Sequence, residues 1–160
     1  MEKVAKAVLR YLFQQYLKGP AVVYQINGIT TQHNADPIML SDYMVEKNWI
    51  REQWVHQNNM VTCKITVQGI EEINPSFIHN KLKDLIDRLV RTDGRKDLME
   101  IFQHNIREYS IALDMIYQLE KLKLVAVVHH AGRIAIELTP SGWRYAEQNG
   151  RPLLALISVA

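Results

Sequence analysis

Apolar residues recur at intervals of three and four in several segments of this chain, a spacing that places them on one face of an α-helix. The first such segment begins the chain and ends at Gly19-Pro20, because glycine suits the position after a helix and proline cannot continue one. Asp36-Pro37 is typical of an N-cap followed by the first helical residue, and predicts a helix that ends near residue 48. Further segments predict a long helix capped by Ser76 and another helix over about residues 108–123.

Between these helices the pattern changes to that of extended chain. Residues 50–65 and residues 124–138 each contain two β-branched, apolar runs around a polar or glycine-containing turn, which predicts two β-hairpins. Asn27-Gly28, within another β-branched segment, favours the positive backbone angles of a third tight turn. Each of the two long hairpins is expected to follow one helix and to precede another.

The order of these elements repeats along the chain. Glu46-Lys47 precedes the first hairpin and Glu120-Lys121 the second, at an offset of 74 residues. Thr66-Val-Gln-Gly follows the first hairpin and Thr139-Pro-Ser-Gly the second, at an offset of 73, so the second hairpin is expected to be one residue shorter. We infer an internal duplication with domains at residues 1–75 and 76–150, followed by an apolar tail over residues 151–160.

The composition is that of an ordinary globular protein, with 48% apolar and 22% charged residues. No apolar run approaches the roughly 20 residues of a membrane-spanning helix, and charges interrupt the first apolar segment, unlike a secretory signal. The lone Cys63 cannot form an internal disulfide or a cysteine-rich zinc site. These features predict a soluble, cytoplasmic protein of the α+β class, mostly helical.

Each half resembles a winged-helix domain, in which an opening helix, a helix-turn-helix and a β-hairpin wing follow one another. The second half carries the fuller similarity, over the run that ends in Leu138-Thr139-Pro140-Ser141-Gly142. Between Gly19 and Asp36 the first half has strand and turn signals where the superfamily has a short second helix. The resemblance implies two tandem winged-helix domains, a non-enzymatic role in DNA binding or transcription regulation, and duplex DNA as the partner.

The resemblance also nominates the outward face of the helix before each wing, together with the wing tip, as the nucleic-acid interface. In the second half these positions are Arg107, Ser110, Gln118, Lys121, His130 and Arg133; in the first half they are Lys47, Asn48 and Asn58, with Ser41, Gln57 and Asn59 beside them. Asp114 and Asp42 are unfavourable on such a surface, because a carboxylate repels phosphate. The formal net charge is only +2, so the alternative is a winged-helix protein–protein interaction module that binds no DNA.

Other chemistry has little support in the sequence. No Gly-rich phosphate loop or nucleophile elbow occurs, and no cofactor is expected. The neighbours His129 and His130 would point to opposite faces of a strand, so they cannot chelate one metal ion together. Cys63 lies in an alternating strand and is expected to be a small buried side chain.

Two apolar surfaces favour self-association. The tail, residues 151–160, and the long helix over residues 76–92 carry more apolar side chains than so small a domain needs. We therefore expect a homodimer.

Overall fold

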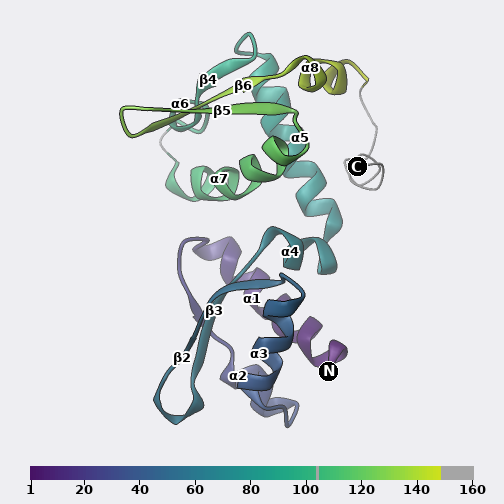
Figure 1. Cartoon of the computed structure of the whole chain (residues 1–160), viewed down its shortest axis with the longest axis vertical. Helices are drawn as coiled ribbons and strands as arrows, with labels where there is room; N and C mark the ends of the chain where they lie inside the picture. Colours follow the sequence, from purple (N-terminus) through teal and green to yellow (C-terminus); the bar gives the residue numbers. More distant parts are fainter. Residues whose placement is uncertain (104, 149–160) are drawn as a thin grey trace. The chain divides into compact units, whose positions relative to one another are not determined.

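The computed structural model describes residues 1–103 and 105–148, and the chain divides into two compact units. Unit 1 spans Met1–Phe77, and unit 2 spans Ile78–Ala160. Each unit combines helices with a small antiparallel sheet of three strands, so the protein belongs to the α+β class (Figure 1). The predicted apolar tail, residues 151–160, lies outside the described residues.

Unit 1 contains four α-helices, three strands and a short 3-10 helix. In chain order these are α1 (Glu2–Lys18), β1 (Tyr24–Gln25), α2 (Asn27–Gln32), α3 (Pro37–Glu46), β2 (Ile50–Val55), the 3-10 helix (Gln57–Asn59), β3 (Val61–Ile65) and α4 (Val67–Ile73). The strand β3 lies between β1 and β2. Val8 and Leu9 of α1, Met44 of α3 and Val61 and Cys63 of β3 are fully buried and form the centre of this unit.

Unit 2 follows the same plan. Its elements are α5 (Pro75–Val90), which begins just before the boundary, β4 (Arg95–Asp97), α6 (Leu98–Ile101), α7 (Ile106–Lys121), β5 (Val125–His130), β6 (Arg133–Leu138) and α8 (Pro140–Glu147). The strand β6 lies between β4 and β5, as β3 does between β1 and β2. The predicted hairpins are therefore confirmed, and both units have the order helix, strand, helix, helix, strand, strand, helix.

The junction between the hairpin and the final helix contains the same hydrogen bonds in both units. The Thr66 hydroxyl caps α4 by accepting from the Gly69 amide, and the Thr139 hydroxyl caps α8 by accepting from the Gly142 amide. The Thr66 amide donates to the Trp49 carbonyl, and the Thr139 amide donates to the Leu124 carbonyl. These contacts bind the start of each final helix to the end of the helix that precedes the hairpin.

The junction also corrects the predicted register of the repeat. The Trp49 amide donates to the Met44 carbonyl as the Leu124 amide donates to the Leu119 carbonyl, so α3 and α7 correspond at an offset of 75 residues, not 74. The predicted offset of 74 would match Val45 with Leu119, and this match is wrong, because Val45 is 39% exposed whereas Leu119 is fully buried.

The first hairpin is accordingly two residues longer than the second. Ile50 pairs with Ile65, and Val125 pairs with Leu138, so β2 and β3 enclose two more residues than β5 and β6. A bulge between Arg51 and Trp54 interrupts the first hairpin, with Glu52 at a φ of 53°.

The segment around Asn27-Gly28 is a helix, and the predicted tight turn there is wrong. The Asn27 side-chain amide donates to the Asn59 carbonyl, and its oxygen accepts from the Val61 amide. The side chain of Asn27 thus binds the turn of the first hairpin, and Asn27 is also the first residue of α2. Of the extended structure expected around Asn27-Gly28, only the two-residue strand β1 (Tyr24–Gln25) is found. Unit 1 therefore has the short second helix that the sequence did not reveal.

Two smaller features in the middle of the chain differ from what the sequence indicates. Ser76 lies inside α5, and the Asn74 side chain accepts from the Phe77 amide in its place. Arg95, Lys96 and Asp97 form the edge strand β4, an element that the sequence did not predict. Pairing with β6 stabilises this strand although it has only three residues, all of them charged.

The apolar face of α5 belongs to a core and is not an exposed dimer surface. Five of its large apolar side chains are at most 4% exposed: Ile78, Leu82, Leu85, Ile86 and Leu89. The helix therefore gives no support to the expected homodimer, and that expectation now depends on residues 151–160, outside the described residues.

Candidate nucleic-acid interface

The helix α7 presents one face to solvent because its opposite face is buried. The Asn105 side chain caps α7 by accepting from the Glu108 amide. The buried face of α7 consists of Ile111, Ala112, Met115, Ile116 and Leu119, which recur at helical spacing. On the outer side, the nominated Arg107 and Lys121 are exposed, whereas the nominated Ser110 and Gln118 are half-buried.

Basic residues stand at the two ends of α7, and neutral or acidic residues lie between them. Arg107 is the second residue of α7, and Lys121 is the last. At 1.5 Å per residue, their Cα atoms lie about 21 Å apart along the helix axis. The half-buried Asp114 lies between them, and Tyr117 is 54% exposed. A helix of this length can cross the roughly 12 Å wide major groove and bring a cation to the backbone at each end.

The hairpin of unit 2, which the sequence nominated as a wing, has its turn at Ala131 and Gly132, both with positive φ, of 49° and 75°. His130 and Arg133 pair across this turn, and both are exposed. The Arg133 side chain is 73% exposed, but its Nη1 lies 4.0 Å from Oδ2 of Asp97, so one carboxylate partly offsets the charge of the wing.

A shallow hollow adjoins this part of the wing. It is lined by the side chains of three strands: Arg95, Asp97, Val128, His130, Arg133 and Ala135. The strand β4 thus adds Arg95 beside the nominated wing residues, a contribution that the sequence did not predict.

In unit 1 Asn48 and Ser41 make structural hydrogen bonds, whereas Lys47 and Asn58 are exposed. Asn48 has a φ of 58°, and its carbonyl accepts from the Thr66 hydroxyl. Asn58 is exposed in the wing turn, at a φ of 61°. Lys47 is exposed, with its Nζ 5.7 Å from the centre of the Tyr43 ring. Ser41, expected on the outer face, is fully buried, and its hydroxyl donates to the Ile38 carbonyl.

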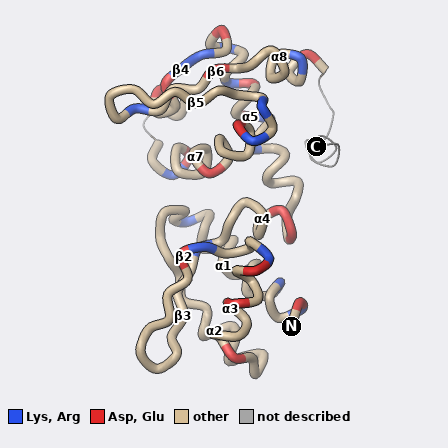
Figure 2. Tube along the Cα trace, in the orientation of Figure 1, with Lys and Arg blue, Asp and Glu red and all other residues tan. Residues whose placement is uncertain are grey.

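The two units also differ in charge on the helix before the wing. At the offset of 75 residues, Glu46 takes the place of Lys121, and Asp42 takes the place of the neutral Tyr117. Both carboxylates are exposed, and acidic residues mark α3 along the trace in Figure 2. Met39, in the place of Asp114, is 60% exposed. The outer face of α3 is therefore acidic and apolar, whereas α7 has a cation at each end.

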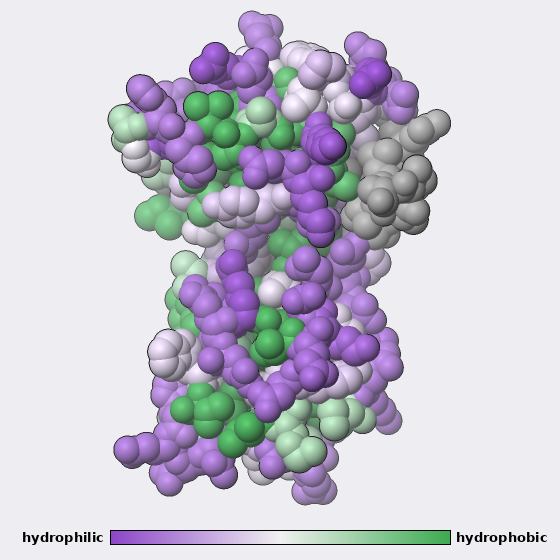
Figure 3. Space-filling model, viewed as in Figure 1, coloured by the Kyte–Doolittle hydropathy of each residue, from purple (hydrophilic) through white to green (hydrophobic). Residues whose placement is uncertain are grey.

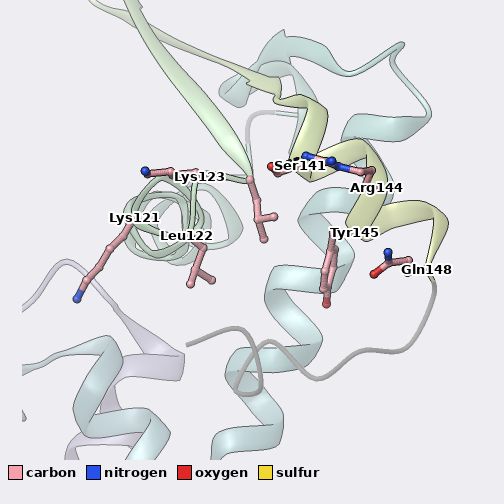
Figure 4. A pocket seen from close by; sticks show the side chains of 8 residues that line it. Lys121, Leu122, Lys123, Ser141, Arg144, Tyr145 and Gln148 are labelled. Carbon is pink, nitrogen blue, oxygen red and sulfur yellow. Dashed lines mark hydrogen bonds between the residues drawn. The ribbon is translucent and has the colours of Figure 1, made fainter. Parts of the chain in front are cut away.

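Sequence reasoning missed a second group of cations, at the C-terminal end of α7. Lys121, Lys123 and Arg144 line one hollow with Ser141 and Tyr145 (Figure 4). Lys123 and Arg144 belong to different elements, and only the packing of α8 against the end of α7 brings them together. A search of the sequence for Lys and Arg near the turn after α7 would have found Lys121 and Lys123 but not Arg144.

Among the described residues, no group of three or more His, Cys, Asp or Glu side chains is placed to hold a metal ion. His129 and His130 are both exposed on β5. Within the same described residues, no helix combines the length and the apolar character that crossing a membrane requires.

Cys63 is fully buried in β3, and burial raises the pKa of its thiol to about 12. Since the thiolate is the reactive form, we expect the native protein to react with a maleimide at pH 8 roughly a thousandfold more slowly than a model thiol does. The same protein in concentrated urea should react at the ordinary rate, which serves as the control. Rapid labelling without urea would contradict the burial of this residue.

Comparison with known proteins adds no family to this description. The sequence matches no family model, and neither curated proteins nor solved structures show a significant similarity to it. Function must therefore be inferred from the two units themselves and from the difference between them.

Proposed function

We propose that the chain consists of two tandem winged-helix domains and that unit 2 binds duplex DNA as a non-enzymatic, transcription-regulator-like protein. The order of elements in both units supports this proposal, because each has a short helix, a longer helix and a hairpin wing in succession. In unit 2, α7 is the helix that enters the major groove, and the hairpin β5–β6 is the wing.

The observation that carries the proposal is the placement of cations around α7. Arg107 and Lys121 occupy its two ends, and β5 runs back along the helix, so the wing tip with Arg133 lies toward the end where α7 begins (Figure 1). Phosphate contacts from these three residues would fix the helix in the groove. The amide of Gln118 is then the side chain best suited to read a base edge.

Unit 1 favours a second function, recognition of another protein. Its α3 exposes Met39 beside Asp42 and Glu46, and its wing exposes Trp54, with 66% of that residue accessible. Apolar surface also reaches the exterior of unit 1 in Figure 3. An exposed tryptophan and an acidic helix face suit a protein partner better than phosphate. The alternative function is therefore a protein–protein interaction module, in which the wings contact a protein and not DNA.

The test is a fluorescence anisotropy titration of a labelled random duplex at low salt and then at increasing salt. With about four phosphates neutralised per chain, log K should fall with log[salt] at a slope of roughly −3 to −4. So few contacts make a monomer bind weakly, and we propose that a homodimer joins two half-sites. No binding at tens of micromolar protein would end the DNA proposal and leave protein recognition as the function.

A further inference from the structure

The hollow at the end of α7 is built from the last residues of that helix, the residues that follow it, and α8. Its lining consists of Lys121, Leu122, Lys123, Leu124, Ser141, Arg144, Tyr145 and Gln148. Three of these side chains are basic, and none is a carboxylate. In Figure 4 the guanidinium of Arg144 turns toward Ser141 on one side, while the two lysines lie on the other and extend outward.

The backbone around this hollow is firmly held. The Thr139 hydroxyl donates to the Lys123 carbonyl, and the Thr139 amide donates to the Leu124 carbonyl, so α8 begins against the end of α7. On α8, Nη2 of Arg144 donates to the Ser141 hydroxyl at 3.2 Å. The cations are therefore attached to a fixed frame, although the lysine side chains themselves are exposed.

The cations do not serve the fold as partners of nearby acids. In the part of the chain that the structure describes, none of the ion pairs involves Lys121, Lys123 or Arg144. Three positive charges around one hollow repel one another, and a negatively charged ligand would relieve that repulsion.

Unit 1 provides an internal comparison, because it has the same junction with the opposite charge. Glu46 and Asn48 correspond to Lys121 and Lys123, and Glu71 corresponds to Arg144. The fold itself thus requires no cation here, and the basic residues are specific to unit 2.

We propose that this hollow is a phosphate-binding site, held by Lys121, Lys123 and Arg144 with the Ser141 hydroxyl as a further donor. In the proposed function, which this inference extends, its ligand is a DNA backbone phosphate at the C-terminal end of α7. A guanidinium, two ammonium groups and a hydroxyl supply hydrogen-bond donors around a phosphate group. The site would complement Arg107 at the other end of the same helix.

The test uses the full chain with the double substitution Lys123→Asn and Arg144→Gln. Asn48 occupies the position equivalent to Lys123, which has a φ of 60°, so asparagine keeps this backbone conformation. The matched control is Arg91→Gln, which removes an exposed cation of unit 2 outside α7, the wing and α8. Thermal melting monitored by circular dichroism establishes that all variants fold.

In the anisotropy titration, the double variant should bind random duplex roughly tenfold more weakly at low salt. Its salt slope should be about 1 smaller than that of the wild type, for every DNA sequence alike, because one phosphate contact is lost. The control should match the wild type. If the wild type binds DNA and the double variant has the same affinity and slope, the phosphate site is refuted while the proposed function stands.

A second measurement separates the two proposals when no duplex binding is seen. The melting temperature is compared in inorganic phosphate and in chloride at equal ionic strength. A rise in phosphate for the wild type and the control, absent in the double variant, would establish a site for a free phosphate anion and refute the DNA function. With neither DNA binding nor this rise, both proposals fail.

Discussion

Replacing Gly142 with alanine is expected to destabilise unit 2 by about 3 kcal/mol, because the new methyl group has no room. A Cβ atom at this position would lie 2.1 Å from the Leu124 carbonyl oxygen and 2.9 Å from Cδ2 of Leu138. The carbonyl is backbone and accepts from the Thr139 amide, so α8 would have to separate from the end of α7. Gly69→Ala should affect unit 1 similarly, since its Cβ would lie 2.3 Å from the Trp49 carbonyl oxygen.

Urea denaturation followed by circular dichroism measures these losses, with each variant affecting the transition of its own unit. Gly28→Ala is the matched control, because a Cβ there meets no atom within 4 Å and the residue lies in the helix α2. That substitution should stabilise the protein by roughly 0.5–1 kcal/mol, since alanine loses less backbone entropy than glycine in a helix. Similar stability of the Gly142 variant and the control would show that the junction has room for a methyl group beside the Leu124 carbonyl.

The sequence predicted several elements from local signals. The cap at Asp36 and the two hairpins, over residues 50–65 and 124–138, depend on residues close to one another in the chain, and they were found where expected. The spacing of apolar residues and the identity of cap and turn residues suffice to predict such elements, because their hydrogen bonds join residues that are close in sequence.

Elements that depend on distant partners were not predictable in this way. The helix α2 begins at Asn27, whose side chain bonds to Asn59 and Val61, more than thirty residues further along the chain. The strand β4 exists because β6 pairs with it. The one-residue error in the register of the repeat has a similar cause, since a bulge in β2 lengthens the first hairpin.

The same distinction applies to the candidate interface. Arg107, Lys121 and Arg133 were nominated by the resemblance to winged-helix domains, and all three are exposed. Ser41 was misplaced because the expected face of α3 was wrong, and the residue that corresponds to it in α7 is the buried Ile116. The pairing of Lys123 with Arg144 in one hollow requires the packing of α8, which no local pattern encodes.

Reversing the charge of Lys121 should have the largest effect on DNA binding of any single change at the end of α7. Lys121→Glu removes a proposed phosphate contact and adds a repelling carboxylate, so the affinity should fall roughly tenfold to a hundredfold at low salt. The difference should shrink as salt is added, because screening weakens both contributions. Lys121 also ends α7, where a cation favours the helix dipole, so a stability loss of about 0.5 kcal/mol should accompany the change.

Glu46→Lys is the counterpart, because Glu46 holds the equivalent place at the end of α3. If unit 2 alone contacts DNA through specific phosphates, this variant should bind within about twofold of the wild type, although it raises the net charge by as much as Lys121→Glu lowers it. Anisotropy titrations of both variants at about 50 mM salt compare them directly. Wild-type affinity in Lys121→Glu would show that α7 does not face DNA. A large gain in Glu46→Lys would instead show that unit 1 also lies against the duplex, since only a cation close to the phosphates releases counterions.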